Sequence, residues 1–130
     1  MRTDVIDYLQ TQNFGTFIVS NELSFSESGT PLYIKNLKKI YVDVDQYTAE
    51  PIITTLNGVN ITRDTIAVKV YFANDAKSIP PNYDEVVSLI RTAKDVLPTA
   101  GFSSREVDVQ TSFEADRLVT EIELRFIKLT

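Results

Sequence analysis

Alternation of apolar and polar residues along four segments constrains the fold of this chain more than any other feature. In a β-strand, successive side chains point to opposite faces, so residues two apart share a face. The residues that would share one face of these segments are apolar: Ile40, Val42 and Val44; Ile66, Val68, Val70 and Phe72; Val107, Val109 and Phe113; Leu118, Ile122, Leu124 and Phe126. This pattern predicts half-buried strands in a mainly antiparallel sheet that is covered on one face.

Two amphipathic segments are available to cover that face. Thr3 is predicted to cap a helix that runs to about Gln12, and a second helix is expected after Pro80-Pro81, where Asn82 and Glu85 resemble a capping box. The apolar stripes of the two helices are Val5, Ile6 and Leu9, and Tyr83, Val86, Ile90, Ala93 and Leu97, with Pro98 and Gly101 ending the second. The prediction is one α+β domain over residues 1–130, with both helices on one face of the sheet, in the order α-β-β-β-α-β-β and with a protruding long β-hairpin.

The hairpin is predicted from Asn57-Gly58, because both residues of a tight two-residue turn must accept positive φ. Such a loop pairs residues of the two arms as follows: Leu56 with Val59, Thr54 with Ile61, and Ile52 with Arg63. The predicted apolar strip therefore consists of Ile52, Leu56, Val59 and Ile61, on the side opposite to the core residues of the same strand. Either a β-bulge near Arg63-Asp64 returns this strip to the core, or the tip is apolar on the side away from the helices and contacts another molecule.

Composition limits the chemistry that the chain can perform. It contains no cysteine and no histidine, so thiol chemistry is excluded and the commonest general base and metal ligand are missing. The formal net charge of −5 argues against sequence-independent nucleic-acid binding, and Lys35, Lys38 and Lys39 form the only basic cluster. No stretch approaches the roughly 18 apolar residues of a membrane span, and the amino terminus has no signal-peptide pattern. The expectation is a protein that is not an enzyme.

Acidic side chains on the polar side of the predicted sheet are the remaining chemical signal. Asp43 and Asp45 are two apart on one strand, and Glu121 and Glu123 lie on another. Carboxylates that converge in a pocket can bind a metal ion, but alternating charge on the solvated side of a sheet explains the same pattern. The prediction is an exposed acidic sheet face, with no metal and no cofactor.

The order of elements resembles the tail terminator proteins of long-tailed bacteriophages. The resemblance covers nearly the whole chain and rests on its size, its acidity and the segments "YFANDAKSIPPNYDEVVSLIRTAKDVLP", "REVDVQTSF" and "EADRLVTEIELRFIKL". It implies a virion protein, assembled in the host cytoplasm, that forms a hexameric ring on the tail tube, stops tube polymerisation and contacts neck or head-completion proteins. DNA would pass through the lumen without specific binding, and the family has no catalytic residues to transfer.

The resemblance also suggests roles for the two surfaces. Asp43, Asp45, Glu121 and Glu123 would suit an acidic lumen that does not hold DNA, and the apolar strip would contact a neighbouring subunit or the tube. A head–tail connector or another tail-completion adaptor is the nearest alternative. A monomeric protein-binding module is the second, and a carboxylate metal enzyme the third.

Overall fold

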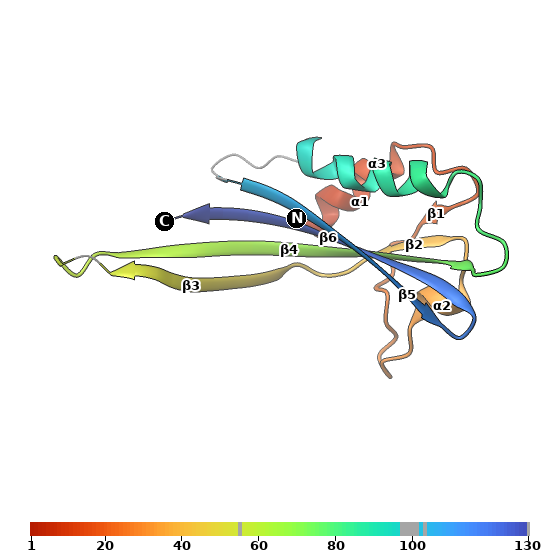
Figure 1. Cartoon of the computed structure of the whole chain (residues 1–130), viewed down its shortest axis with the longest axis horizontal. Helices are drawn as coiled ribbons and strands as arrows, with labels where there is room; N and C mark the ends of the chain where they lie inside the picture. The colour runs from red at the N-terminus through yellow and green to blue at the C-terminus, as the bar shows by residue number, and fades with distance from the viewer. Residues whose placement is uncertain (55, 97–101, 103, 130) are drawn as a thin grey trace.

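The protein is a mixed α+β domain built on one six-stranded, mostly antiparallel sheet. The computed structural model describes residues 1–54, 56–96, 102 and 104–129. Its elements are α1 (Arg2–Gln10), β1 (Ile18–Val19), α2 (Leu32–Lys35), β2 (Lys39–Val42), β3 (Gln46–Thr54), β4 (Asn60–Asp75), α3 (Tyr83–Val96), β5 (Ser104–Glu114) and β6 (Arg117–Leu129) (Figure 1). The predicted class is therefore confirmed, but the predicted order α-β-β-β-α-β-β is not, because four strands rather than three lie between α1 and α3 and the short helix α2 was not predicted.

Strand β4 organises the sheet. The strand order is β1-β2-β4-β6-β5, and β3 also pairs with β4. Along one edge of β4, β2 pairs near Tyr71, whereas β3 pairs from Ala67 outward to Asn60. Along the other edge, β6 pairs continuously from Arg63 to Asp75. One long strand thus carries two successive neighbours on one side and a single neighbour on the other.

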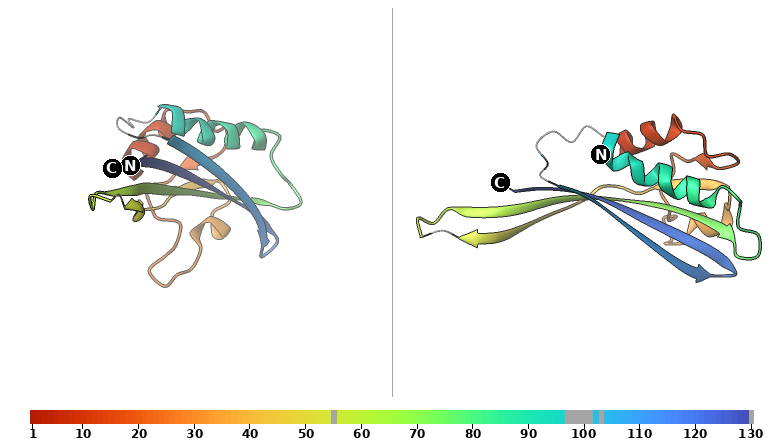
Figure 2. Two further views of the ribbon diagram at one scale, coloured as in Figure 1. Left: turned by 60° about the vertical axis from the view of Figure 1, so that its left-hand side comes forward. Right: turned by 45° about the horizontal axis from the view of Figure 1, so that its top comes forward.

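The main core lies between the sheet and the helices α1 and α3, which cover the same face (Figures 1 and 2). Most of its buried members follow the predicted alternation and helical stripes, and Phe14 and Phe17 from the segment after α1 complete it: Val5, Ile6, Leu9, Ile40, Val42, Val68, Val70, Phe72, Val86, Ile90, Ala93, Ile122, Leu124 and Phe126. Three residues predicted on this face are exposed instead, namely Val44, Val109 and Phe113. Val44 lies beyond the end of β2, and the other two lie on the edge strand β5. Leu97, Pro98 and Gly101 are outside the described residues.

The amino-terminal helix begins two residues earlier than predicted and uses a different cap. Its N-cap is Met1, without a side-chain cap of its own, so the prediction that Thr3 caps the helix is wrong. The carboxylate of Asp45 instead accepts hydrogen bonds from the Met1 amino group (2.9 Å) and from the Arg2 backbone N–H (2.7 Å). A carboxylate at this end satisfies unpaired N–H groups and interacts favourably with the helix dipole.

A second, smaller core covers part of the opposite face of the sheet. Helix α2 packs there, and the cluster consists of Tyr33, Tyr41, Tyr71, Ala73 and Val119. Tyr41 has an exposed fraction of 0%, although its alternation with Ile40 and Val42 places it on the side opposite to the main core. The alternation assigned Tyr41 to the correct side of β2, but it did not show that residues before β2 fold back over that side.

Candidate functional site

The hairpin of β3 and β4 extends away from both cores as a two-stranded arm (Figures 1 and 2). Strand β6 reaches Arg63 of β4, and from there to Asn60 the described partner of β4 is β3 alone. An exposed ion pair between Arg63 and Glu50, at 3.2 Å, joins the two strands at this point. Isolated two-stranded hairpins are only marginally stable in water, so contacts within its own chain contribute little to the stability of the outer arm.

The tip of the arm differs from the predicted two-residue turn. Thr54 pairs with Asn60, which places Leu56 and Val59 in the connection rather than in the ladder. Gly58 has positive φ (76°), but Asn57 does not. The predicted register is wrong because the connection is longer than two residues and β3 contains an irregularity between Pro51 and Ile53.

The side chains at the tip remain exposed. Ile53 pairs with Ile61, and Ile61 continues the alternation that puts Lys69 and Tyr71 on the face away from α1 and α3. The register shift between β3 and β4 lies in β3, opposite Thr62 and Ile61, whereas β4 pairs with β6 without a shift through Arg63-Asp64, so no bulge in β4 returns the strip to the core. The exposed apolar residues of the arm are Ile52, Ile53, Leu56 and Val59, while Ile61 is half-buried. We call these five residues the apolar tip.

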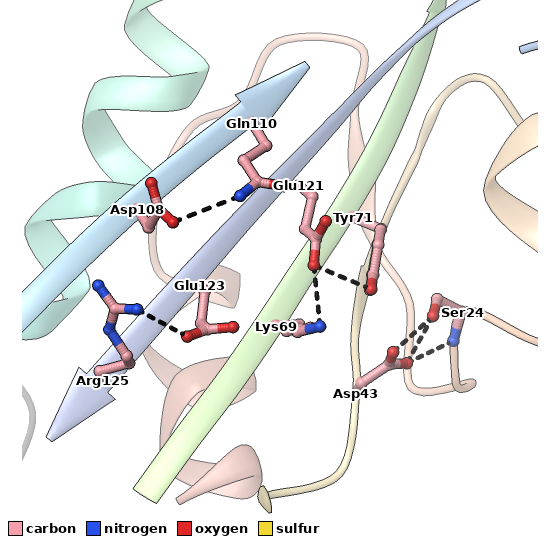
Figure 3. A network of polar contacts seen from close by, with 9 residues as sticks. All are labelled: Ser24, Asp43, Lys69, Tyr71, Asp108, Gln110, Glu121, Glu123 and Arg125. Carbon is pink, nitrogen blue, oxygen red and sulfur yellow. Dashed lines mark hydrogen bonds and ion pairs between the residues drawn. The ribbon is translucent and has the colours of Figure 1, made fainter. Parts of the chain in front are cut away.

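The second candidate surface is the part of the sheet face that α2 leaves uncovered (Figure 3). Glu121 Oε1 forms an ion pair with Lys69 Nζ (3.1 Å) and accepts a hydrogen bond from the Tyr71 hydroxyl (3.2 Å). Burial first, and then the nearby carboxylates, of which Glu121 is the strongest, raise the pKa of Tyr71. The Tyr71 hydroxyl therefore remains a protonated donor at neutral pH.

Carboxylates outnumber cations on this face. The Arg125 guanidinium contacts Glu123 and Glu106, each at 3.3 Å. Asp108 lies directly across from Glu123 in the ladder, where two like charges are unfavourable. The acidic residues Glu106, Asp108, Glu121 and Glu123 share this face with the cations Lys69 and Arg125, so this part of the face is negatively charged. Glu121 and Glu123 lie on it, but both are half-buried and engaged in ion pairs.

The predicted pair of Asp43 and Asp45 does not share this surface. Asp45 lies in the connection between β2 and β3 and binds the start of α1. Asp43 accepts hydrogen bonds from the Ser24 backbone N–H (2.9 Å) and from the Ser24 hydroxyl (2.6 and 2.7 Å) (Figure 3). The alternation fails here because the strand ends at Val42. Asp43 therefore anchors the segment that leads into α2.

We expect Ser24→Ala to lower the free energy of unfolding by about 1–2 kcal/mol, because it removes the hydroxyl donor from a carboxylate. Ser24 is fully buried, so water cannot replace the lost contact freely. Urea unfolding monitored by circular dichroism measures the change. Ser28→Ala, at an exposed hydroxyl of the same segment, is the matched control. Equal stability of the two variants would contradict the anchoring role.

Within the described residues, no group of three or more acidic side chains is placed to hold a metal ion. In the same residues, no helix combines the length and the apolar character needed to cross a membrane. Comparison of the chain with protein-family models and with curated proteins gives no match. Two surfaces, the apolar tip and the acidic sheet face, are thus the features on which a function can be argued.

Proposed function

We propose that this chain is a structural virion protein, a tail terminator that forms a hexameric ring on the tail tube of a long-tailed bacteriophage and joins it to the neck. In this role it stops tube polymerisation, and its partners are further copies of itself, the tube protein and a neck or head-completion protein. The resemblance of the sequence to that family supplies the biological setting. The exposed apolar tip of the arm is the observation that carries the proposal.

The arm favours assembly because its apolar side chains remain largely exposed to water in the single chain, so a contact with another molecule can bury them. Each Val, Leu or Ile side chain contributes about 1.5–3 kcal/mol when it moves completely from water into a contact. Several such side chains at one tip offset part of the roughly 4–15 kcal/mol that association costs. A tip that binds a different surface on the next copy makes a heterologous contact, and repeated heterologous contacts close into a ring when the rotation allows it.

The acidic sheet face supports the same proposal. A channel that DNA traverses must not bind the phosphate backbone, and negative charge on its wall repels it. We propose that Glu121 and Glu123 lie toward this channel, whereas Asp43 is engaged by Ser24. Asp45 is excluded from that role by its contacts with the start of α1.

Native mass spectrometry over a range of concentrations, combined with negative-stain electron microscopy, tests the proposal. We expect rings of six copies of the 14.7 kDa chain, at high concentration or on addition of the cognate tail tube. A chain that stays monomeric under both conditions and binds no tube protein would refute it. A dimer that does not close into a ring would also refute it.

The alternative of a monomeric binding module also has a structural basis. Strand β3 pairs only with β4 in the described structure, so its outer edge is available to a peptide strand. The mass measurement separates the two proposals, because this alternative predicts a monomer at all concentrations. A head–tail connector would also form a ring, and binding to isolated tube as opposed to neck protein distinguishes it from a terminator.

A further inference from the structure

An apolar groove lies at the base of the arm, where the hairpin of β3 and β4 begins (Figure 1). It has a volume of about 180 Å³ and is lined by Leu23, Phe25, Asp43, Val44 and Gln46. Its three apolar side chains are partly exposed, with exposed fractions of 42% for Leu23, 41% for Phe25 and 56% for Val44. We call these five residues the basal groove.

The basal groove is fixed by contacts with the second core. Phe25 packs edge-on against Tyr33 and Tyr71, with ring centroids 5.7 and 5.8 Å apart. The neighbouring Ser24 donates hydrogen bonds to the Asp43 carboxylate from its backbone N–H and its hydroxyl. A groove that is already ordered loses little conformational entropy when another molecule binds to it.

The apolar tip cannot fill the basal groove of its own chain. Seven residues of β3 separate Gln46 from Ile53, and a strand rises about 3.3 Å per residue, so the two positions are roughly 23 Å apart. Strand β3 is paired with β4 from Gln46 to Thr54, which keeps the arm extended over that distance. Each surface is therefore open to another molecule.

The tip and the groove match in size and in character. Residues 51–62 include no charged side chain, although the chain has a formal net charge of −5. Leu56 is completely exposed, and its four side-chain carbons fit a groove whose volume corresponds to roughly six water molecules. Asp43, the charged residue of the groove wall, is already engaged by Ser24. A contact between the two surfaces therefore leaves no charge both buried and unpaired.

The apolar area of the two surfaces is sufficient for the anchor of an interface. A fully exposed apolar side chain of this size presents roughly 60–120 Å² of apolar surface. At the exposed fractions of the tip and the groove, their contact buries about 250–500 Å². The smallest standard interface contains about 700 Å² of apolar area. The contact thus supplies roughly a third to two-thirds of what a stable pair of copies needs, which agrees with assembly at high concentration.

We propose that the basal groove of one copy receives the apolar tip of a second copy of this chain. This contact presupposes the proposed ring and assigns the surface that accepts the arm. The exposed side chain of Leu56 enters the groove, and the rest of the tip covers its rim. Each copy has one tip and one groove at opposite ends of the arm, so it makes one contact and receives another. Contacts of this heterologous kind close into a ring when the rotation allows it.

Two variants that each lack one half of the contact test the assignment. The tip variant carries Leu56→Asp and Val59→Asp. The groove variant carries Leu23→Asp, at an exposed position where substitution changes stability little. We expect the groove variant alone to associate about 10–100-fold more weakly than the native chain. An equimolar mixture of the two variants is expected to form a 1:1 pair and no ring, because one intact tip meets one intact groove. Native mass spectrometry at the concentration at which the native chain assembles measures these species.

Disulfide cross-linking detects the contact even where it is transient. The chain has no cysteine, so a cysteine introduced by substitution is its sole thiol. Under mild oxidation, a mixture of Leu56→Cys and Leu23→Cys chains, one of them tagged, is expected to give a mixed dimer. The control replaces the second chain by Ile79→Cys, at an exposed apolar residue between β4 and α3. It should give only the level of random collision, and equal cross-linking of the two mixtures would overturn the assignment.

The outcomes distinguish this contact from the proposed function. If the native chain and the Leu23→Asp chain form rings equally well, the groove is not the acceptor, while the ring itself stands. If the Leu23→Asp chain forms rings but no longer binds the tail tube, the groove receives the tube protein in place of a second copy. A native chain that assembles under no condition overturns the ring and this contact together.

Discussion

Replacement of both Leu56 and Val59 by aspartate is expected to abolish assembly and to leave the monomer folded. Both side chains lie in the connection at the end of the arm, where Leu56 is fully exposed and Val59 has an exposed fraction of 59%. Surface substitutions of this kind change stability by about 0.5 kcal/mol or less. In the proposed ring the same positions would be buried, and an aspartate there would lose the apolar contribution and place an unpaired charge in the contact. We expect the association constant to fall at least about 100-fold.

The control for this double variant is Ile79→Asp, which charges an exposed apolar residue in the connection between β4 and α3. Light scattering after size-exclusion chromatography reports the mass of each variant, and circular dichroism reports its folding. Retention of the native assembly by the double variant would show that the tip is not an interface. Unfolding of the double variant would show that the tip belongs to the core of its own chain.

Tyr41→Ala is expected to lower the free energy of unfolding by about 3–5 kcal/mol, the cost of removing a large aromatic side chain from a core. Tyr41 is completely buried, and its hydroxyl accepts a hydrogen bond from the Asn36 side-chain amide at 2.9 Å. A loss of this size is a large fraction of the roughly 5–15 kcal/mol that stabilises a typical domain. The expected result is a domain that is marginally folded at room temperature.

Two further substitutions separate packing from hydrogen bonding at Tyr41. Tyr41→Phe keeps the ring and should cost about 1 kcal/mol. Phe113→Ala removes an aromatic side chain with an exposed fraction of 75% and should cost less than that. Urea unfolding of the three variants gives the comparison. If Tyr41→Ala were no more destabilising than Phe113→Ala, the second core would not contribute to stability.

The sequence predicted those parts of the fold that depend on periodicity. Alternation in β4 and β6 and the helical stripe of α3 identified one covered face, because apolar side chains two or four residues apart must share a side. Periodicity did not predict α2, since a four-residue helix is too short to show a stripe. It therefore could not show that Tyr33 covers Tyr41 and Tyr71 on the opposite face.

The candidate site was predicted less completely for two physical reasons. The sequence predicted Thr54 as the partner of Ile61, whereas the longer connection and the extra residue in β3 make Ile53 its partner. A single inserted residue exchanges the faces of all residues beyond it. The second core beside α2 joins residues of α2, β2, β4 and β6, and their convergence is a tertiary property. Tyr33 carries no sequence signal of its role, because nothing in its neighbourhood distinguishes it from an ordinary core tyrosine.

The continuity of β4 has a mechanical consequence. Strand β4 runs from Asn60 at the tip to Asp75 at the far end of the sheet, and β6 pairs with it over most of that length. Hydrogen bonds in an antiparallel pair lie perpendicular to the strands, so a pull on the tip along β4 loads these bonds in parallel, and they must break together. Strand β3 lies at the edge and can be peeled away bond by bond. The arm therefore resists traction through the strand that is anchored in the centre of the domain.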